Sequence, residues 1–330
     1  MAGIGFTLNR ILQKRTYRST FTAYGYAALI SSGPWVLSIL SLALLGFFTT
    51  GSRRELALFY VAVTHVFGFS LIFTGPVQLV LTRYTADRIY DGREEEIFPA
   101  FLRAVSTVAL IALATGGTFF LGFTSANWWF RFGATELFIA VCCLWLATVL
   151  LSAIKDYHHV LTCFLAGYLA SFLLAWSFRS HGSGAVMCGF ASGQLLLFGL
   201  LTATIYRQFG ACGNAQANLF SYFPKHAMLA ACGLLYNLGI WSDKFLHWWF
   251  SPHKIHMAGA LYASPFYDEA VSLSFLSIAP GMAVFLLAME TKFAVHYETF
   301  FRKILERAVF RDETRGRLRP ALRNARIAVG

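Results

Sequence analysis

Hydroxyl side chains recur at helical spacing inside the first long apolar segment, residues 27–48. Ser31, Pro34, Ser38 and Ser41 are three, four and three residues apart, so they share one face of a helix. Small hydroxyl residues can hydrogen-bond a neutral polar solute, and they also permit close helix packing. The face therefore indicates either a polar path through the helices or a tight helix contact.

A second polar face lies in the apolar segment 57–81, where Ser70, Thr74 and Gln78 occupy positions i, i+4 and i+8. His65 is the only titratable residue well inside an apolar segment. An ionisable group at membrane depth is a functional candidate, although a hydrogen-bonded packing histidine is also tolerated there. The segment thus predicts a polar path with a titratable group, or a hydrogen-bonded helix contact.

Polar groups also mark a later segment. Asn237 lies inside 227–242, and Asp243 and Lys244 follow at its end. Charges at a span end either reach water or take part in function. We expect His65, Asp243 and Lys244 to be the candidates for ion coupling or gating.

Proline breaks accompany these polar faces at Gly33-Pro34, Gly75-Pro76 and Pro280-Gly281. A proline removes one backbone donor and crowds the preceding turn, so it kinks or breaks a helix. In lipid, irregular backbone survives only against protein or a water-filled cavity. The breaks therefore predict either ordinary bent helices or discontinuous helices beside a transport path.

Composition identifies the elements that carry these groups. The chain is 57% hydrophobic and only 13% charged, and its mean hydropathy is +0.58. Such values predict a polytopic all-α membrane bundle. Eight apolar segments approach spanning length: 27–48, 57–81, 104–123, 137–154, 160–178, 184–205, 227–242 and 269–289.

The net charge of +11 follows the expected membrane topology and does not indicate nucleic-acid binding. With a cytoplasmic N-terminus, twenty-one of the 27 Lys and Arg residues fall in inner segments. We therefore expect both termini to be cytoplasmic. Residues 1–26 are expected to form an amphipathic arm and residues 291–330 a basic amphipathic tail. Between them we expect a six-helix bundle over 27–205 and the start of a second over 206–290.

Several chemistries lack sequence support. There is no P-loop, zinc HExxH or nucleophile-elbow motif, so we expect neither an enzyme nor a bound metal or cofactor. The cysteines lie in spans or in an inner loop, and no disulfide is expected. Glu94–Glu96 are expected to be solvated, and the histidines of the long outer loop 243–268 lack metal-site spacing. A membrane glycosyltransferase would need acidic residues such as Glu94–Glu96 and Asp156, which form no convincing site.

Five strings together resemble the PelG family of exopolysaccharide transporters, in order along the chain to about residue 305. They are MAGIGF at 1–6, YGYAALISSGPW at 24–35, FTGPVQLVLTRYTADRIY at 73–90, YNLGIWSDKF at 236–245 and YDEAVSLSFLSIAPGMAVFLLAMETKF at 267–293.

The resemblance implies a polysaccharide flippase-like protein of the bacterial inner membrane. It would move a GalNAc- and GlcNAc-rich polymer from cytoplasm to periplasm for a biofilm matrix. Companion Pel membrane subunits and a cytosolic glycosyltransferase are implied as partners, besides lipids and the polysaccharide. With the polar faces, the resemblance places the path at Ser31, Pro34, Ser38, Ser70, Thr74, Gln78, Asn237 and Ser277.

The resemblance also implies twelve helices in two halves, whereas we count six plus two before a tail that departs from the family at Arg311. Alternating access needs both halves. A truncated, transport-inactive scaffold that binds the other components is therefore the second reading, and a membrane glycosyltransferase is the third.

Overall fold

A computed structural model describes residues 16–48, 52–151, 157–210 and 218–289, together with 291, 300, 303 and 304. The expected N-terminal arm up to residue 15 and almost all of the expected tail lie outside the described residues, as do Cys212 and Asp156. The chain divides into two compact units, Ser32–Ala279 and the combination of Met1–Ser31 with Pro280–Gly330. The polar groups discussed below belong to the unit Ser32–Ala279, except where stated.

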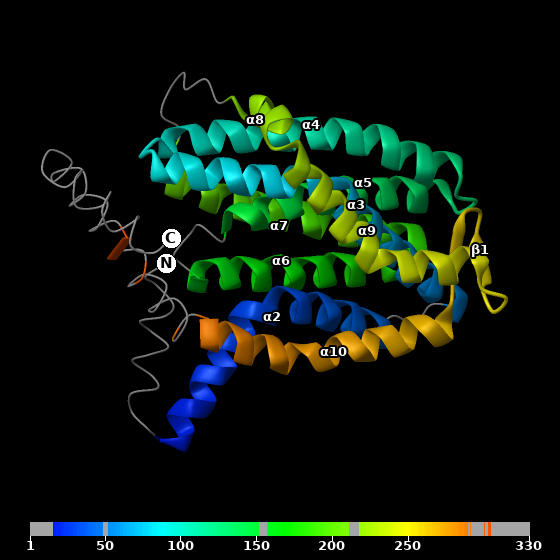
Figure 1. The fold of residues 1–330 in the computed structure, drawn as a ribbon. Coiled ribbons are helices and arrows are strands. Elements are labelled where there is room, and N and C mark those ends of the chain that lie inside the picture. The colour runs from blue at the N-terminus through cyan, green and yellow to red at the C-terminus, as the bar shows by residue number, and fades with distance from the viewer. Residues whose placement is uncertain are drawn as a thin grey trace, which may run out of the picture. The chain divides into compact units, whose positions relative to one another are not determined.

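The described residues are mainly helical, as the composition predicts (Figure 1). The longer helices are α2 Tyr17–Phe48, α3 Arg53–Tyr90, α4 Ile97–Gly117, α5 Trp128–Leu151, α6 Tyr157–Ser177, α7 Ser183–Phe209, α9 Ala227–Phe250 and α10 Pro265–Ala288. Shorter elements are the 3-10 turns η1 Glu94–Glu96, η3 Arg179–His181 and η4 Leu219–Ser221, the π-helical turn η2 Thr118–Gly122, and α8 Tyr222–Lys225.

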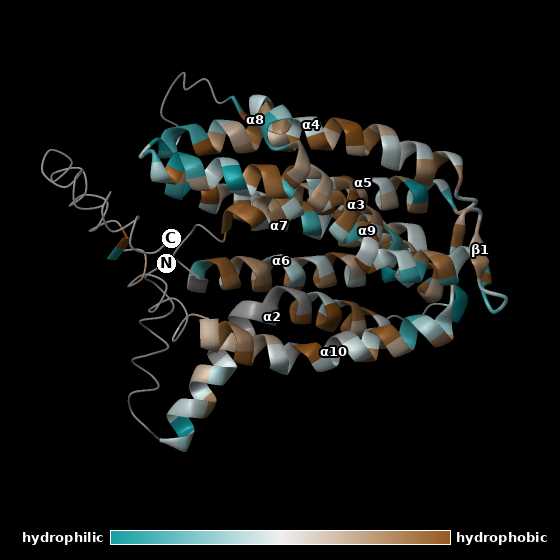
Figure 2. Ribbon diagram, in the orientation of Figure 1, coloured by the Kyte–Doolittle hydropathy of each residue, from teal (hydrophilic) through white to brown (hydrophobic). Residues whose placement is uncertain are grey.

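Five helices in the described part of the chain are long and apolar enough to cross a membrane. They are Arg53–Tyr90, Glu94–Gly122, Trp128–Leu151, His159–Ser177 and Ser183–Phe209. Figure 2 shows apolar residues along the length of these helices and hydrophilic residues where α3 ends and α4 begins. This arrangement supports an all-α membrane bundle, while the count of eight spans and the orientation of the termini stay predictions.

The core of the larger unit is built around α5, which packs against α3, α4 and α7, while α6 packs on α7. Phe130 and Leu137 of α5 and Phe190 and Leu197 of α7 are fully buried there. Gly193 of α7 approaches the backbone of α6 so closely that a Cβ at this position would overlap it. Small residues thus bring these helices together, as is common in membrane bundles.

The proline-containing helices are not discontinuous. α2 runs unbroken past Pro34, α3 past Pro76 and α10 past Pro280. Of the two alternatives, discontinuous helices are therefore wrong, and continuous helices that contain a proline are what the described backbone shows. The physical reason is that one proline removes a single backbone hydrogen bond, a loss that a long helix can tolerate without ending.

The expected outer loop 243–268 is largely structured. α9 continues to Phe250, past the predicted end at residue 242, because Lys244 finds partners inside the protein. A hairpin follows, with β1 Ile255–Ala258 antiparallel to β2 Leu261–Ala263. At its turn Gly259 has φ +61°, and the following Ala260 amide donates to the Phe123 carbonyl at 2.8 Å. The hairpin is thereby fixed to the segment between α4 and α5.

Candidate functional site

The polar face of α3 forms a hydrogen-bonded ladder. The Gln78 amide donates to the Thr74 hydroxyl at 2.7 Å, and that hydroxyl donates to the Ser70 carbonyl at 2.7 Å. The Trp145 indole of α5 donates to the Ser70 hydroxyl at 3.0 Å. Ser70 and Thr74 are fully buried. The structure therefore brings three predicted path residues together, on the side of α3 that faces α5.

A different side of α3 meets α9. Gly75 and Gly233 lie against each other: a Cβ on Gly233 would come within 2.2 Å of the Gly75 carbonyl oxygen. Asn237 lies at the same crossing, with its amide donating to the Gly233 carbonyl at 3.0 Å and lying 2.6 Å from where a Gly75 Cβ would be. About two turns away along each helix, Gly68 packs on the Trp241 ring. We call this contact the α3–α9 seam.

Two groups of predicted path residues are therefore separate. Ser70 and Gly75 are five residues apart, about 140° around a helix with 3.6 residues per turn. Asn237 faces the seam, whereas Ser70 is bonded to Trp145 of α5. Gln78 is one turn beyond Gly75 along α3, between the two directions.

The remaining path residues lie elsewhere. Ser38 is buried and is a hydrogen-bond partner of the Tyr168 side chain, so this part of the α2 face contacts α6. Ser277 is exposed on α10 and donates to the Ser274 carbonyl. Ser31 and Pro34 lie within α2, but their side chains are outside the described ones.

His65, the predicted titratable group, is completely buried beside α9. Its ring stacks on Trp248 with centroids 4.1 Å apart. Its Nδ1 lies 2.8 Å from the Val61 carbonyl oxygen, which places the proton on Nδ1. The other ring nitrogen, Nε2, has no hydrogen-bond partner among the described residues. His65 thus offers a buried, unused acceptor next to the seam.

Asp268, in the first turn of α10, links this histidine to Lys244. The Trp248 indole donates to both Asp268 carboxylate oxygens, at 3.0 and 3.1 Å, and the Ser264 amide donates at 3.1 Å. Lys244 Nζ is 3.9 Å from the same carboxylate, and its side chain is buried. The Asp268 carboxylate therefore accepts hydrogen bonds from the Trp248 indole and from the backbone amide of Ser264, just before α10, and it also lies beside the Lys244 ammonium.

Asp243 makes a separate contact with α10. Its carboxylate accepts a hydrogen bond from the Tyr267 hydroxyl, and the Tyr267 ring stacks on His247 with centroids 3.6 Å apart. The predicted coupling residues His65, Asp243 and Lys244 are thus gathered where α3, α9 and the start of α10 meet. We call this group, with Trp248 and Asp268, the charged cluster.

Burial shifts two titratable groups of this region that lie outside the spans expected from the sequence. It lowers the pKa of Lys244, and the carboxylates of Asp268 and Asp243 oppose that shift. Burial, with the hydrogen bond to Asp243, raises the pKa of Tyr267 to about 12. Tyr267 is therefore a neutral donor at physiological pH, and the two carboxylates favour the charged form of Lys244 against the effect of burial.

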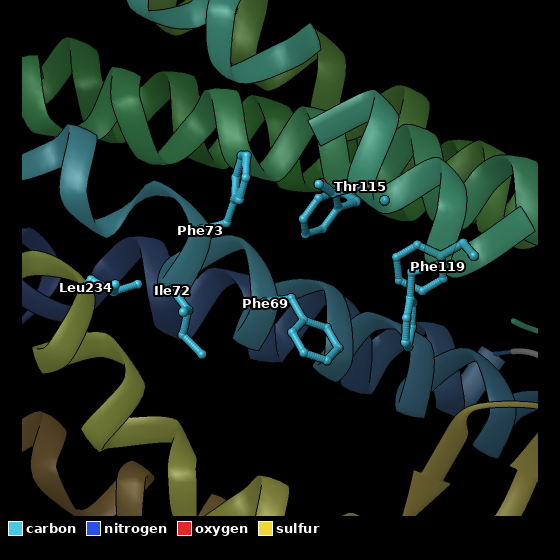
Figure 3. Close-up of a pocket in the computed structure, with 9 residues that line it drawn as sticks. Phe69, Ile72, Phe73, Thr115, Phe119 and Leu234 are labelled. Atoms are coloured by element: carbon cyan, nitrogen blue, oxygen red, sulfur yellow. The ribbon is translucent and has the colours of Figure 1, made fainter. Parts of the chain in front are cut away.

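An apolar pocket of about 380 Å³ lies between α3, α4, η2, α5 and α9. Figure 3 shows Phe69, Ile72 and Phe73 of α3 at this pocket, with Leu234 of α9 and Phe119 of η2. None of the predicted path residues lines it. Its aromatic and aliphatic lining suits apolar groups and offers little hydrogen bonding to a sugar.

Glu96 contradicts the expectation that Glu94–Glu96 are all solvated. Its side chain is buried, pairs with Arg88 at 3.2 Å and with Arg93, and accepts from the Tyr84 hydroxyl at 3.1 Å. Arg88 also donates to the Tyr222 hydroxyl at 2.7 Å. The glutamates diverge because they are consecutive in one turn, and only Glu96 faces the bundle.

Sequence reasoning missed Asp268, Glu96 and Gly233. An acidic residue in the first turn of a helix is a recognisable local signal, and Asp268 carries it. Its contacts with Trp248 and Lys244 cross between helices, as do those of Glu96 and Gly233, and no local pattern reports them. In the described part of the chain, no cluster of three or more His, Cys, Asp or Glu has the arrangement of a metal site.

Comparison with known proteins identifies one family. The family described as PelG, "Putative exopolysaccharide Exporter (EPS-E)", matches residues 1–317. The match reaches past residue 305, so residues 311–317, which we had expected to depart from the family, are included. No curated protein and no solved structure matches the chain. A match over nearly the whole sequence leads to one conclusion: the chain belongs to the PelG family of exopolysaccharide exporters.

Proposed function

We propose that this protein moves a GalNAc- and GlcNAc-rich polysaccharide across the bacterial inner membrane, from cytoplasm to periplasm, for a biofilm matrix. The family match over residues 1–317 is the observation that carries the proposal. The helical, largely apolar structure supports a membrane location. The protein would act without covalent chemistry, together with companion Pel membrane subunits and a cytosolic glycosyltransferase that supplies the polymer.

We place the polymer path along the α3–α9 seam. On the expected division at residue 205, α3 belongs to the first bundle and α9 begins the second, and transporter sites lie where such halves meet. Asn237 at the seam and Gln78 beside it supply the hydrogen-bonding groups, and Trp241 supplies an apolar ring. Separation of the two helices at Gly75 and Gly233 would open the path. Ser70 and Thr74 support Gln78 from the α5 side.

Gln78→Leu is the test of this path. The change removes an amide beside the seam, and loss of one hydrogen bond to the polymer is expected to reduce export roughly fivefold. Export is measured as lectin-reactive extracellular polymer in cells whose only copy is the variant, with membrane levels checked by immunoblot. Thr82→Val is the matched control, because the exposed Thr82 hydroxyl bonds only the backbone of its own helix in the described structure.

The outcomes separate the path from the function. Unchanged export by Gln78→Leu at equal membrane levels would remove Gln78 from the path and leave the exporter proposal standing. Unchanged export after deletion of the whole chain would overturn the exporter proposal. If the unaltered chain does not export polymer but still recovers the companion subunits, the scaffold function is correct instead. Turnover of a nucleotide sugar by the purified chain would contradict its noncovalent role.

We assign ion coupling or gating to the charged cluster, with His65, Asp243 and Lys244 as its titratable members. Asp268 connects His65 with Lys244, because it contacts both Lys244 and Trp248, on which His65 stacks. Asp243 reaches the start of α10 separately, through Tyr267. Any movement of the α10 start relative to α9 must break these contacts. The cluster is therefore placed to link a charge change to helix separation at the seam.

Asp268→Asn tests this assignment. The change removes the carboxylate charge that lies 3.9 Å from the buried Lys244 ammonium, so that Lys244 keeps only the attraction of Asp243. We expect export to fall far more than for Glu269→Gln, a change of the exposed neighbouring residue. Polymer export is measured with and without a protonophore. Equal export and equal protonophore sensitivity in both variants would exclude a coupling role for the cluster.

A further inference from the structure

A second pocket, of about 450 Å³, lies where the end of α3 meets the start of α9. Its lining divides by chemistry. Arg83, Lys225 and His226 supply cationic or ionisable groups, and Met228, Leu229 and Cys232 supply an apolar wall. It shares no lining residue with the pocket described above. We call it the basic pocket.

The charge of the basic pocket is only partly compensated. Arg83 pairs with Asp87 of its own helix at 3.0 Å, so its guanidinium is largely occupied. Lys225 is exposed and forms no salt bridge with any described residue. The His226 ring rests against Tyr222, with centroids 5.4 Å apart. The pocket therefore carries a free positive charge and attracts an anion.

An apolar strip leads from the basic pocket along α9. Met228, Cys232 and Leu235 are four and three residues apart, so they follow one face of the helix. All three are exposed, Met228 at 80% and Leu235 at 63%. A ligand that fits both features has an anionic head and a hydrocarbon tail.

We propose that the basic pocket binds one anionic phospholipid of the membrane. The phosphodiester lies at Lys225, beside Arg83, and an acyl chain follows Met228, Cys232 and Leu235. Basic pockets between membrane helices on the cytoplasmic side are a known mode of anionic-lipid binding. The topology expected from the charge distribution places Arg83 and Lys225 on that side. This inference is independent of the exported polymer.

Native mass spectrometry of the full-length protein in detergent tests the proposal. Added phosphatidylglycerol is expected to remain on the wild-type protein in preference to phosphatidylcholine. Lys225→Gln is expected to weaken phosphatidylglycerol retention roughly fivefold, as one lysine near a lipid surface contributes about that factor. Arg207→Gln is the matched control, because Arg207 is exposed in the last turn of α7 and does not line the pocket.

A second variant tests the binding of the lipid's acyl chain. Cys232→Trp fills the apolar wall and is expected to reduce retention of phosphatidylglycerol while the melting temperature is unchanged. Inorganic phosphate at millimolar concentration distinguishes the source of the anion: it should not displace the lipid. Displacement by phosphate would identify a free-anion site and overturn the lipid assignment. Equal retention by wild type, Lys225→Gln and Cys232→Trp would also overturn it.

Discussion

Gly233→Leu is expected to destabilise the protein by about 3 kcal/mol or more, the upper end of the effect of overpacking a tight contact. An added Cβ would lie 2.2 Å from the Gly75 carbonyl oxygen and 2.7 Å from its carbonyl carbon. These are backbone atoms, which cannot rotate away as a flexible side chain does. α9 must therefore move away from α3, and the seam opens.

The measurement is the thermal unfolding of the purified protein in detergent, where we expect the melting temperature to fall by several degrees. Gly239→Leu is the matched control on the same helix, because a Cβ there meets no atom within 4 Å. Leucine forms helices better than glycine, so that variant should be as stable as the wild type or slightly more stable. Equal melting temperatures for the two variants would show that the helices do not cross at Gly233.

Glu96→Ala is expected to cost about 3 kcal/mol, because it leaves the largely buried Arg88 with only its longer pairing to the exposed Asp91, at 3.7 Å. The Arg88 side chain is only 12% exposed, and its contacts reach Tyr222, which precedes α9. Arg93 is largely exposed, so its own pairing with Glu96 contributes little. The loss of stability therefore comes mainly from the Arg88 guanidinium and the Tyr84 hydroxyl, which both lose their contact with Glu96.

Denaturant unfolding of the purified protein measures this loss. Glu95→Ala is the control, since Glu95 is the exposed neighbour in the same turn and its removal should change stability by about 0.5 kcal/mol or less. The double variant Glu96→Ala with Arg88→Met should recover part of the stability, because the unpaired charge is gone. A double variant no more stable than Glu96→Ala would contradict the buried-charge explanation.

The helices themselves followed from local patterns. Each of the apolar segments expected to span the membrane falls mostly within a helix, since a run of about 20 apolar residues is helical for reasons that need no distant partner. The helix ends predicted from the sequence were less accurate. α9 passes residue 242 because Lys244 is satisfied by Asp268, twenty-four residues away, and no window over 227–242 contains that partner.

The polar faces show most clearly how far residue spacing predicts the contacts of a helix. Ser70, Thr74 and Gln78 were expected on one face, and they form one ladder, because spacing of four residues fixes their neighbourhood within a helix. Spacing does not fix which helix that face meets. The structure turns the ladder toward Trp145 of α5 and turns Gly75 toward α9.

The sequence by itself determined that this is a helical membrane protein of the PelG family, because hydrophobic length and the family strings are local properties of the chain. Only the tertiary structure decided that Gly75 meets Gly233, that Glu96 is buried among arginines, and that Asp268 joins Trp248 to Lys244. Those contacts depend on how helices rotate and cross, which is set by close packing between distant segments.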